Sequence, residues 1–256
     1  MRIQSASQIG PAGPSSSRSS LSIAVASLPA LVLVCVAVWS GSTRILAALL
    51  LAAIVLGSIV AANALLDSGI AQYLTRKLGH VVAGLVFLVM PIVFDGPGIP
   101  LVLCATFTVI MAAGKRWAPG LIRGVGGTGR SAAMAEVWYP ISCGVSVFVG
   151  WSLLHNAWLG VLPALFLGFG DAITGVARSV IYKREVKGVA GSFAMLAICS
   201  LLSLLITPHW IGLAGAVTAT FFERITTATA HWDDNASLTL SSTLVMALLY
   251  VRFVPV

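Results

Sequence analysis

The sequence predicts an all-α membrane protein, a polytopic transmembrane helical bundle of about nine spans (seven to nine) with its N-terminus in the cytoplasm. Of its 256 residues, 58% are hydrophobic and only 9% are charged, and the mean hydropathy is +1.00. A soluble domain carries about 25% charged residues. Apolar runs also recur along the chain, and a helix that crosses a membrane needs about 20 apolar residues.

The N-terminal region divides into a tail and two spans. Residues 1–20 are rich in Ser, Gly and Pro and read as a disordered cytoplasmic tail. A signal peptide is disfavoured, because the next run has the length of a span and lacks a convincing cleavage site. Residues 21–66 hold two spans, and residues 67–256 form a membrane-embedded domain. The predicted spans lie near 21–39, 44–66, 78–94, 98–113, 134–153, 158–178, 190–207, 209–222 and 237–255. The fourth and eighth are short enough to be re-entrant.

The placement of basic residues supports this topology. Cytoplasmic loops carry an excess of Lys and Arg, and an N-terminus inside makes 1–20, 67–77, 114–133, 179–189 and 223–236 cytoplasmic. With Arg178 at one edge, these pieces hold 13 of the 15 basic residues: Arg2, Arg18, Arg76, Lys77, Lys115, Arg116, Arg123, Arg130, Arg178, Lys183, Arg184, Lys187 and Arg224. Only Arg44 and Arg252 fall outside. The net charge of +7 therefore reports topology, and no nucleic-acid partner is expected.

The cysteines give no sign of a zinc site or a disulfide framework. Cys35, Cys104, Cys143 and Cys199 are scattered, each inside an apolar run, without a Cys-x-x-Cys or Cys/His pair. We expect them to be small buried hydrophobic residues.

The first two cytoplasmic loops each allow two interpretations. Arg76 and Lys77 are typical of a positive-inside anchor, but His80, at the start of the next span, can contact a phosphate or shuttle a proton. Residues 124–131 match the Gly-x-Gly-x-x-Gly pattern. A membrane span precedes them rather than a β-strand, which argues against a dinucleotide or P-loop site. They form a flexible loop or one whose N–H groups hold an anion.

The third loop carries the strongest signal. Asp171 lies in a charge-poor apolar stretch, and acids near membrane depth usually mark function. It can hold Mg²⁺, which prefers one or two carboxylates together with substrate phosphates. The residues that follow suit phosphate binding: Lys183, Arg184 and Lys187 as cations, and Gly191 and Ser192 at a helix start. The alternative is an ordinary basic loop after a helix with one buried, paired acid.

The fourth loop adds Glu223 and the run Asp233-Asp234-Asn235. This run can cap the next helix, or its carboxylates can bind Mg²⁺. With all four loops on one face, the residues indicate a Mg²⁺-dependent enzyme. Its substrates would be a phosphate compound and a lipid-soluble partner that enters between helices.

Short motifs in these loops resemble one known family. Arg76-Lys77-x-x-His80-x-x-x-Gly84, Gly170-Asp171, Lys187-x-x-x-Gly191-Ser192 and Glu223 followed by Asp233-Asp234-Asn235 occur in the order typical of the CTP-dependent polyprenol kinases, which include dolichol, phytol and diacylglycerol kinases. The resemblance covers roughly residues 70–256. Three positions depart from the family pattern: Arg178 replaces a Gly, Gly188 replaces a Ser or Thr, and no Pro follows Asn235.

The resemblance implies phosphoryl transfer from CTP to an isoprenoid or lipid alcohol with Mg²⁺. Combined with the loop chemistry, the predicted catalytic residues are Asp171, His80 and Lys187. The predicted nucleotide-binding residues are Arg76, Lys77, Lys183, Arg184, Gly191, Ser192 and Asn235, and the predicted metal ligands are Asp171, Glu223, Asp233 and Asp234. A cytidylyltransferase that forms a CDP-lipid, and a membrane transporter, remain alternatives. The sequence does not determine the oligomeric state.

Overall fold

The structure, a computed structural model, describes residues 42–126, 134–182, 187–226 and 233–254. These residues form helices and short connections, with no strand among them, so the all-α prediction is confirmed. The helices are α2 (Thr43–Asp67), α3 (Gln72–Val93), α4 (Gly98–Trp117), η1 (Pro119–Leu121), α5 (Ala135–Val147), η2 (Phe148–Leu153), α6 (Ala157–Leu165), η3 (Phe166–Asp171), α7 (Ala172–Ile181), α8 (Val189–Leu202), η4 (Ser203–Leu205), α9 (His209–Ile225) and α10 (Asp234–Phe253).

The chain divides into two compact units, residues 1–49 and residues 50–256. The predicted tail and the predicted span at 21–39 lie outside the described residues. The larger unit begins inside α2, so most of this helix belongs to the same unit as the helices that follow it. Ile59 of α2 forms a buried apolar cluster with Met111 of α4 and Val137 of α5.

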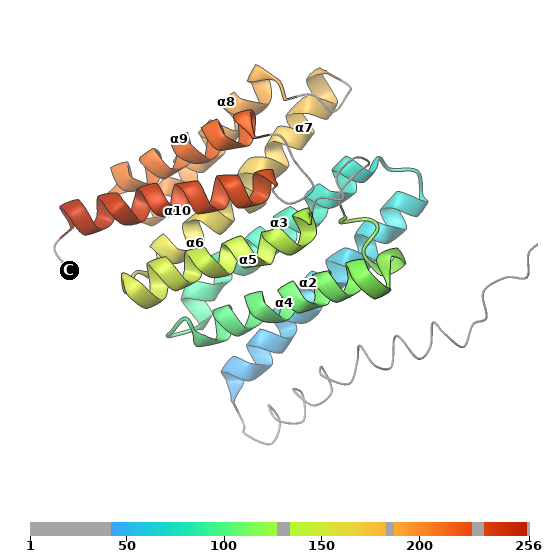
Figure 1. Cartoon of the computed structure of the whole chain (residues 1–256), viewed down its shortest axis with the longest axis horizontal. Helices are drawn as coiled ribbons and strands as arrows, with labels where there is room; N and C mark the ends of the chain where they lie inside the picture. Colours follow the sequence, from blue (N-terminus) through green and yellow to red (C-terminus); the bar gives the residue numbers. More distant parts are fainter. Residues whose placement is uncertain (1–41, 127–133, 183–186, 227–232, 255–256) are drawn as a thin grey trace, which may run out of the picture. The chain divides into compact units, whose positions relative to one another are not determined.

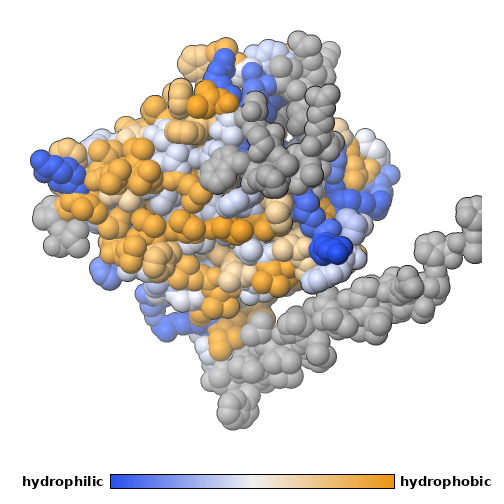
Figure 2. All heavy atoms as spheres, in the orientation of Figure 1, coloured by the Kyte–Doolittle hydropathy of each residue, from blue (hydrophilic) through white to orange (hydrophobic). Residues whose placement is uncertain are grey.

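Five helices are long and apolar enough to cross a membrane, which supports a multi-pass membrane protein. They are Thr43–Asp67, Gln72–Val93, Gly98–Trp117, Ala157–Ile181 and Asp234–Phe253. Large apolar side chains such as Val109, Phe193 and Leu248 are more than half exposed. Figure 2 shows hydrophobic residues over the flanks of the helices, with hydrophilic residues nearer the helix ends. Such a surface suits a lipid environment.

The central helix carries Asp171. It runs from α6 through η3 into α7 as one rod, Ala157–Ile181, and is by far the most buried of the five candidate spans. Its residues 161–167 are apolar on every side and are all fully or almost fully buried, as expected for a helix enclosed by others. Segment η3 is a π-helical turn that ends at Asp171, and π turns within α-helices are frequent at functional sites.

Glycines let α3 approach this central helix closely (Figure 1). A Cβ at Gly168 would lie only 2.7 Å from the Cα of Gly84, and a Cβ at Gly175 would lie 2.8 Å from Cε of Lys77. Small residues at such crossings are typical of membrane helices, where packing rather than hydrophobicity drives association. The two glycine contacts bring the residues around Lys77 and His80 against Asp171.

Several helix ends gather at one end of the larger unit (Figure 1). These are the starts of α3 and α10 and the ends of α4, α7 and α9. The first residues of the glycine-rich segment 124–131 also lie here. Gly124 N donates to Asn63 Oδ1 at 2.7 Å, and the carbonyl of Gly124 accepts from Thr75 Oγ1 at 2.6 Å. The described part of this loop thus packs on α2 and α3, and residues 127–133 lie outside the described residues.

Candidate functional site

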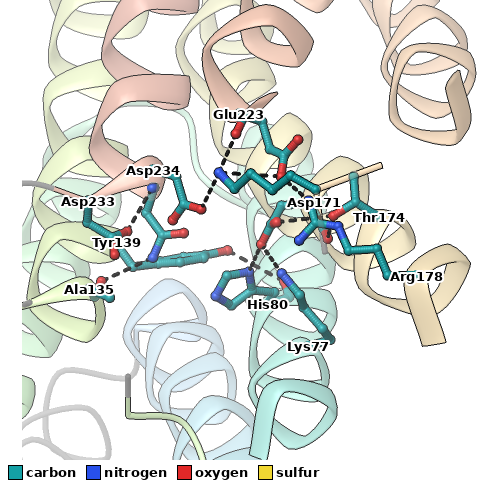
Figure 3. Close-up of polar contacts among 12 residues, drawn as sticks. Lys77, His80, Ala135, Tyr139, Asp171, Thr174, Arg178, Glu223, Asp233 and Asp234 are labelled. Carbon is teal, nitrogen blue, oxygen red and sulfur yellow. Dashed lines mark hydrogen bonds and ion pairs between the residues drawn. The ribbon is translucent and has the colours of Figure 1, made fainter. Parts of the chain in front are cut away.

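Asp171 contacts two basic side chains of α3 (Figure 3). Its Oδ2 lies 2.5 Å from Lys77 Nζ and 2.9 Å from His80 Nδ1. Its Oδ1 faces the hydroxyl of Thr174 at 3.4 Å. Asp171 and His80 are 5% and 7% exposed. Lys77 and His80 reach the same carboxylate because they are three residues apart on one helix face.

A polar cavity of about 280 Å³ opens beside Asp171. Four cations and two carboxylates line it: Arg76, Lys77, Arg178, Lys187, Asp171 and Asp234, together with Tyr73 and Gly175. The excess of positive charge in a concave site suits an anion with several charges. The cavity therefore has the charge expected of a phosphate site.

A second cavity, of about 100 Å³, lies between α2, α3, α4 and α5. Its walls are almost entirely apolar and include Val55, Phe87, Leu103 and Met111. A drug-sized ligand fills a pocket of about 300–1,000 Å³. A cavity of this volume has room for only one end of a long apolar chain.

The two cavities meet at α3. Arg76 lines both, and His80 lines the apolar cavity while its Nδ1 contacts Asp171 of the polar cavity. The ring of Tyr139, which also lines the apolar cavity, lies 4.9 Å from the His80 ring, centroid to centroid. The Asp171–His80 pair thus stands between an apolar compartment and a cationic one.

Glu223 is the second buried acid of the site and is only 1% exposed. It forms an ion pair with Arg178, and its Oε1 lies 3.8 Å from Lys187 Nζ. Lys187 Nζ also donates to the backbone oxygens of Glu223 and Thr226 and lies 3.0 Å from Asp234 Oδ2. A buried charge is tolerated when it is paired and hydrogen-bonded. Glu223 therefore holds Arg178 and Lys187 in place.

The start of α10 faces both cavities. Asp234 lines the polar cavity and Asn235 the apolar one, while Asn235 Nδ2 donates to the carbonyl of Ala135 at 3.2 Å. Asp233 caps the helix, since its Oδ1 accepts from the backbone N–H of Asn235 at 2.8 Å. Burial, together with the neighbouring charge of Asp234, raises the pKa of Asp233 to about 7.

The four predicted metal ligands are distributed rather than clustered. Among the described residues, no three His, Cys, Asp or Glu side chains form a group able to hold a metal ion. Glu223 pairs with Arg178, and Asp233 caps α10. Asp171 and Asp234 do line one cavity. One or two carboxylates beside substrate phosphates are the usual Mg²⁺ ligands, so these two fit that ion.

The predicted phosphate-binding residues are only partly brought together. Arg76, Lys77 and Lys187 line the polar cavity, and Gly191 lies beside it, against Thr174 and Arg178. The hydroxyl of Ser192 instead accepts a hydrogen bond from Arg224 Nη1 at 3.3 Å. Lys183 and Arg184 lie outside the described residues.

Two site residues were missed as candidates. Arg178 entered the sequence analysis as a topological cation and as a departure from the family pattern, although it is 7% exposed and lines the polar cavity. Its position seven residues after Asp171, two helical turns along the same face, was an available signal. The second is Tyr139, whose contact with the His80 ring no sequence pattern predicted.

Searches of family models, curated proteins and solved structures found no match to this chain.

Proposed function

We propose that the protein is an integral membrane kinase that transfers a phosphoryl group from CTP to an isoprenoid or lipid alcohol. One observation carries the proposal: the Asp171–His80 pair lies between an apolar cavity and a cavity lined by Arg76, Lys77 and Lys187. A kinase for a lipid alcohol needs this pair of compartments, because one substrate is a hydrocarbon and the other a polyanion. CTP as donor, and the link to the polyprenol kinases, rest on the sequence motifs.

The proposed reaction is a direct phosphoryl transfer. The hydroxyl oxygen attacks the γ-phosphorus of CTP, the bond from that phosphorus to the βγ-bridging oxygen breaks, and CDP leaves with the electron pair. The proton of the hydroxyl passes to Nε2 of His80, whose Nδ1 is turned to Asp171. Positioning and neutralisation of charge dominate such reactions, and a placed base contributes about 10²–10⁴-fold.

The cations and carboxylates of the polar cavity have separate tasks in this proposal. Arg76 and Lys187 bind phosphate oxygens, and Lys77 holds Asp171 in position. Asp171 and Asp234, which line this cavity, would hold Mg²⁺, and the ion would supply positive charge that neutralises the phosphates.

The proposal includes a topology. We place the N-terminus and the loops that carry the site on the cytoplasmic face, where CTP is found, with nine spans in all. The positive-inside distribution supports this orientation, and the gathering of the corresponding helix ends at one end of the larger unit fits it (Figure 1).

The test is transfer of ³²P from γ-labelled CTP, beside ATP, by the full chain in detergent with Mg²⁺. The acceptors are phytol, geranylgeraniol, dolichol and diacylglycerol. We expect a labelled lipid phosphate with CTP, lost in Asp171→Asn. The matched control is Asp67→Asn, which removes an exposed carboxylate paired with Arg123 and outside both cavities. No labelled lipid from any donor, with folded protein, contradicts the proposal.

The same samples separate the two alternatives. Offered a lipid phosphate and CTP, a cytidylyltransferase releases pyrophosphate and forms a CDP-lipid. A transporter would move a solute into proteoliposomes without nucleotide turnover. If either result is found and no alcohol is phosphorylated, the kinase proposal is wrong and the corresponding alternative takes its place.

A further inference from the structure

Arg178 is a buried cation of the polar cavity that the proposed transfer does not use. Its Nη2 pairs with Glu223 Oε1, and its Nε is buried without a hydrogen-bond partner among the described residues. Buried donors are almost always paired in folded proteins. An unpaired guanidinium N–H on a residue that lines a polar cavity therefore points to a ligand oxygen.

A second anion-binding feature lies next to this nitrogen. Helix α8 begins at Val189, and of its first-turn N–H groups that of Ala190 donates to the hydroxyl of Tyr182 at 3.4 Å. A Cβ at Gly191, in the first turn, would lie 3.6 Å from Arg178 Nε. Backbone N–H groups at a helix N-terminus favour phosphates. The first turn of α8 and Arg178 Nε therefore offer two kinds of hydrogen-bond donor to an anion at the same place.

The distance of Arg178 from Asp171 bears on which part of a bound polyphosphate it would contact. Seven residues separate them along the central helix, a rise of about 10 Å on the same face. The aliphatic stem of Lys77 lies between them against Gly175. The Asp171 end is where the proposed transfer occurs, so Arg178 would face phosphates farther from the point of transfer.

We propose that Arg178 Nε and the first turn of α8 form a phosphate subsite for the part of a polyphosphate that is not transferred. Glu223 is then a positioning residue that orients the guanidinium. The identity of the ligand as the nucleotide of a kinase rests on the proposed function. The affinity of this site for a polyphosphate does not, because it is measured without lipid and without turnover.

The experiment compares an ion-pair replacement inside the cavity with one outside it. Binding of inorganic tripolyphosphate to the full chain in detergent is measured by calorimetry without lipid. Arg178→Met with Glu223→Leu removes both charges, which avoids leaving one buried and unpaired. Arg123→Met with Asp67→Leu removes an exposed pair that lines neither cavity. We expect at least a tenfold loss of affinity in the first variant and no change in the second.

Each outcome decides the proposal. A folded cavity variant that binds tripolyphosphate within twofold of the wild type overturns the subsite and leaves Arg178 as a structural partner of Glu223. If that variant does not fold, Arg178→Lys replaces it, since it keeps the charge and the partner but lacks the Nε–H donor. Wild-type affinity in Arg178→Lys also overturns the subsite. Polyphosphate binding that depends on Arg178, in a protein that phosphorylates no alcohol, supports the subsite and contradicts only the kinase.

Discussion

The two cavities that meet at α3 differ in what encloses them. The apolar one is lined mainly by side chains from within four helices, α2 to α5, such as Val55, Phe87 and Met111. The polar one is bounded by the starts and ends of helices, and its lining side chains are held by ion pairs such as Lys187 with Asp234. Apolar walls favour a hydrocarbon because its burial removes apolar surface from water. Fixed cations favour an anion because they attract its charge and form directional hydrogen bonds with it. The contrast would suit the two unlike substrates of the proposed kinase, with the Asp171–His80 pair between them.

Substitution of Asp171, which lies where the two cavities meet, should have the largest effect on phosphoryl transfer. Asp171→Asn removes the carboxylate that contacts both Lys77 and His80, so we expect phosphoryl transfer to fall by about 10³-fold or more. The amide keeps the size of the side chain, and the thermal melt should show a folded protein. Near-normal transfer would remove Asp171 from the reaction.

Lys187→Ala tests the polar cavity by itself. The ammonium is lost from the cavity lining together with its contact to Asp234. We expect the KM for CTP to rise about 10–100-fold, while the KM for the alcohol stays within twofold. Because Lys187 also donates to the backbone at Glu223 and Thr226, Lys187→Arg serves as the control that retains charge. An effect confined to the alcohol would contradict the assignment.

Ala83→Phe is the converse test. Ala83 lines the apolar cavity, and a larger side chain there fills space that the alkyl chain would occupy. Each buried methylene of a ligand is worth about 0.8 kcal/mol, so exclusion of a few of them raises the KM for the alcohol about tenfold or more. The KM for CTP should not change. A rise in both constants would show that the two cavities are not independent.

The pH dependence of stability gives the smallest effect. The pKa of Asp233 is about 7 in the folded protein, against an ordinary value near 4. Because the folded value is the higher one, its stabilising contribution is complete below about pH 4 and is lost as the pH rises through about 7. We expect the melting temperature to fall by a few degrees between pH 5.5 and 8.5. Asp233→Asn should remove that slope, and an unchanged slope would assign it to another group.

The sequence predicted the helical class and most helix positions, because a scarcity of charge and span-length apolar runs are properties of local composition. It also selected Asp171, since an acid in an apolar run is conspicuous. It did not predict which cations Asp171 would contact. Lys77 and His80 of α3 make these contacts. That pairing depends on a helix crossing between Gly84 and Gly168, 84 residues apart in the chain.

The proposed metal site shows the same limit. Asp171 and the three acids of the predicted loop at 223–236 suggested one cluster, yet Glu223 pairs with Arg178 and Asp233 caps α10. An acid near a helix start can serve the helix or a ligand, and composition alone does not distinguish the two. Only the hydrogen-bond and ion-pair partners of each carboxylate in the structure distinguish a capping role from a ligand-binding role.

The π turn at Phe166–Asp171 has a consequence for how this chain tolerates insertions and deletions. Each residue in an α-helix advances the side-chain direction by about 100°, so the wider turn of η3 sets the direction in which Asp171 points. Deletion of one residue within this turn would rotate everything after it, including Asp171 and Arg178, away from α3. A deletion in a surface connection changes only its length. In this helix, the number of residues is itself part of the site.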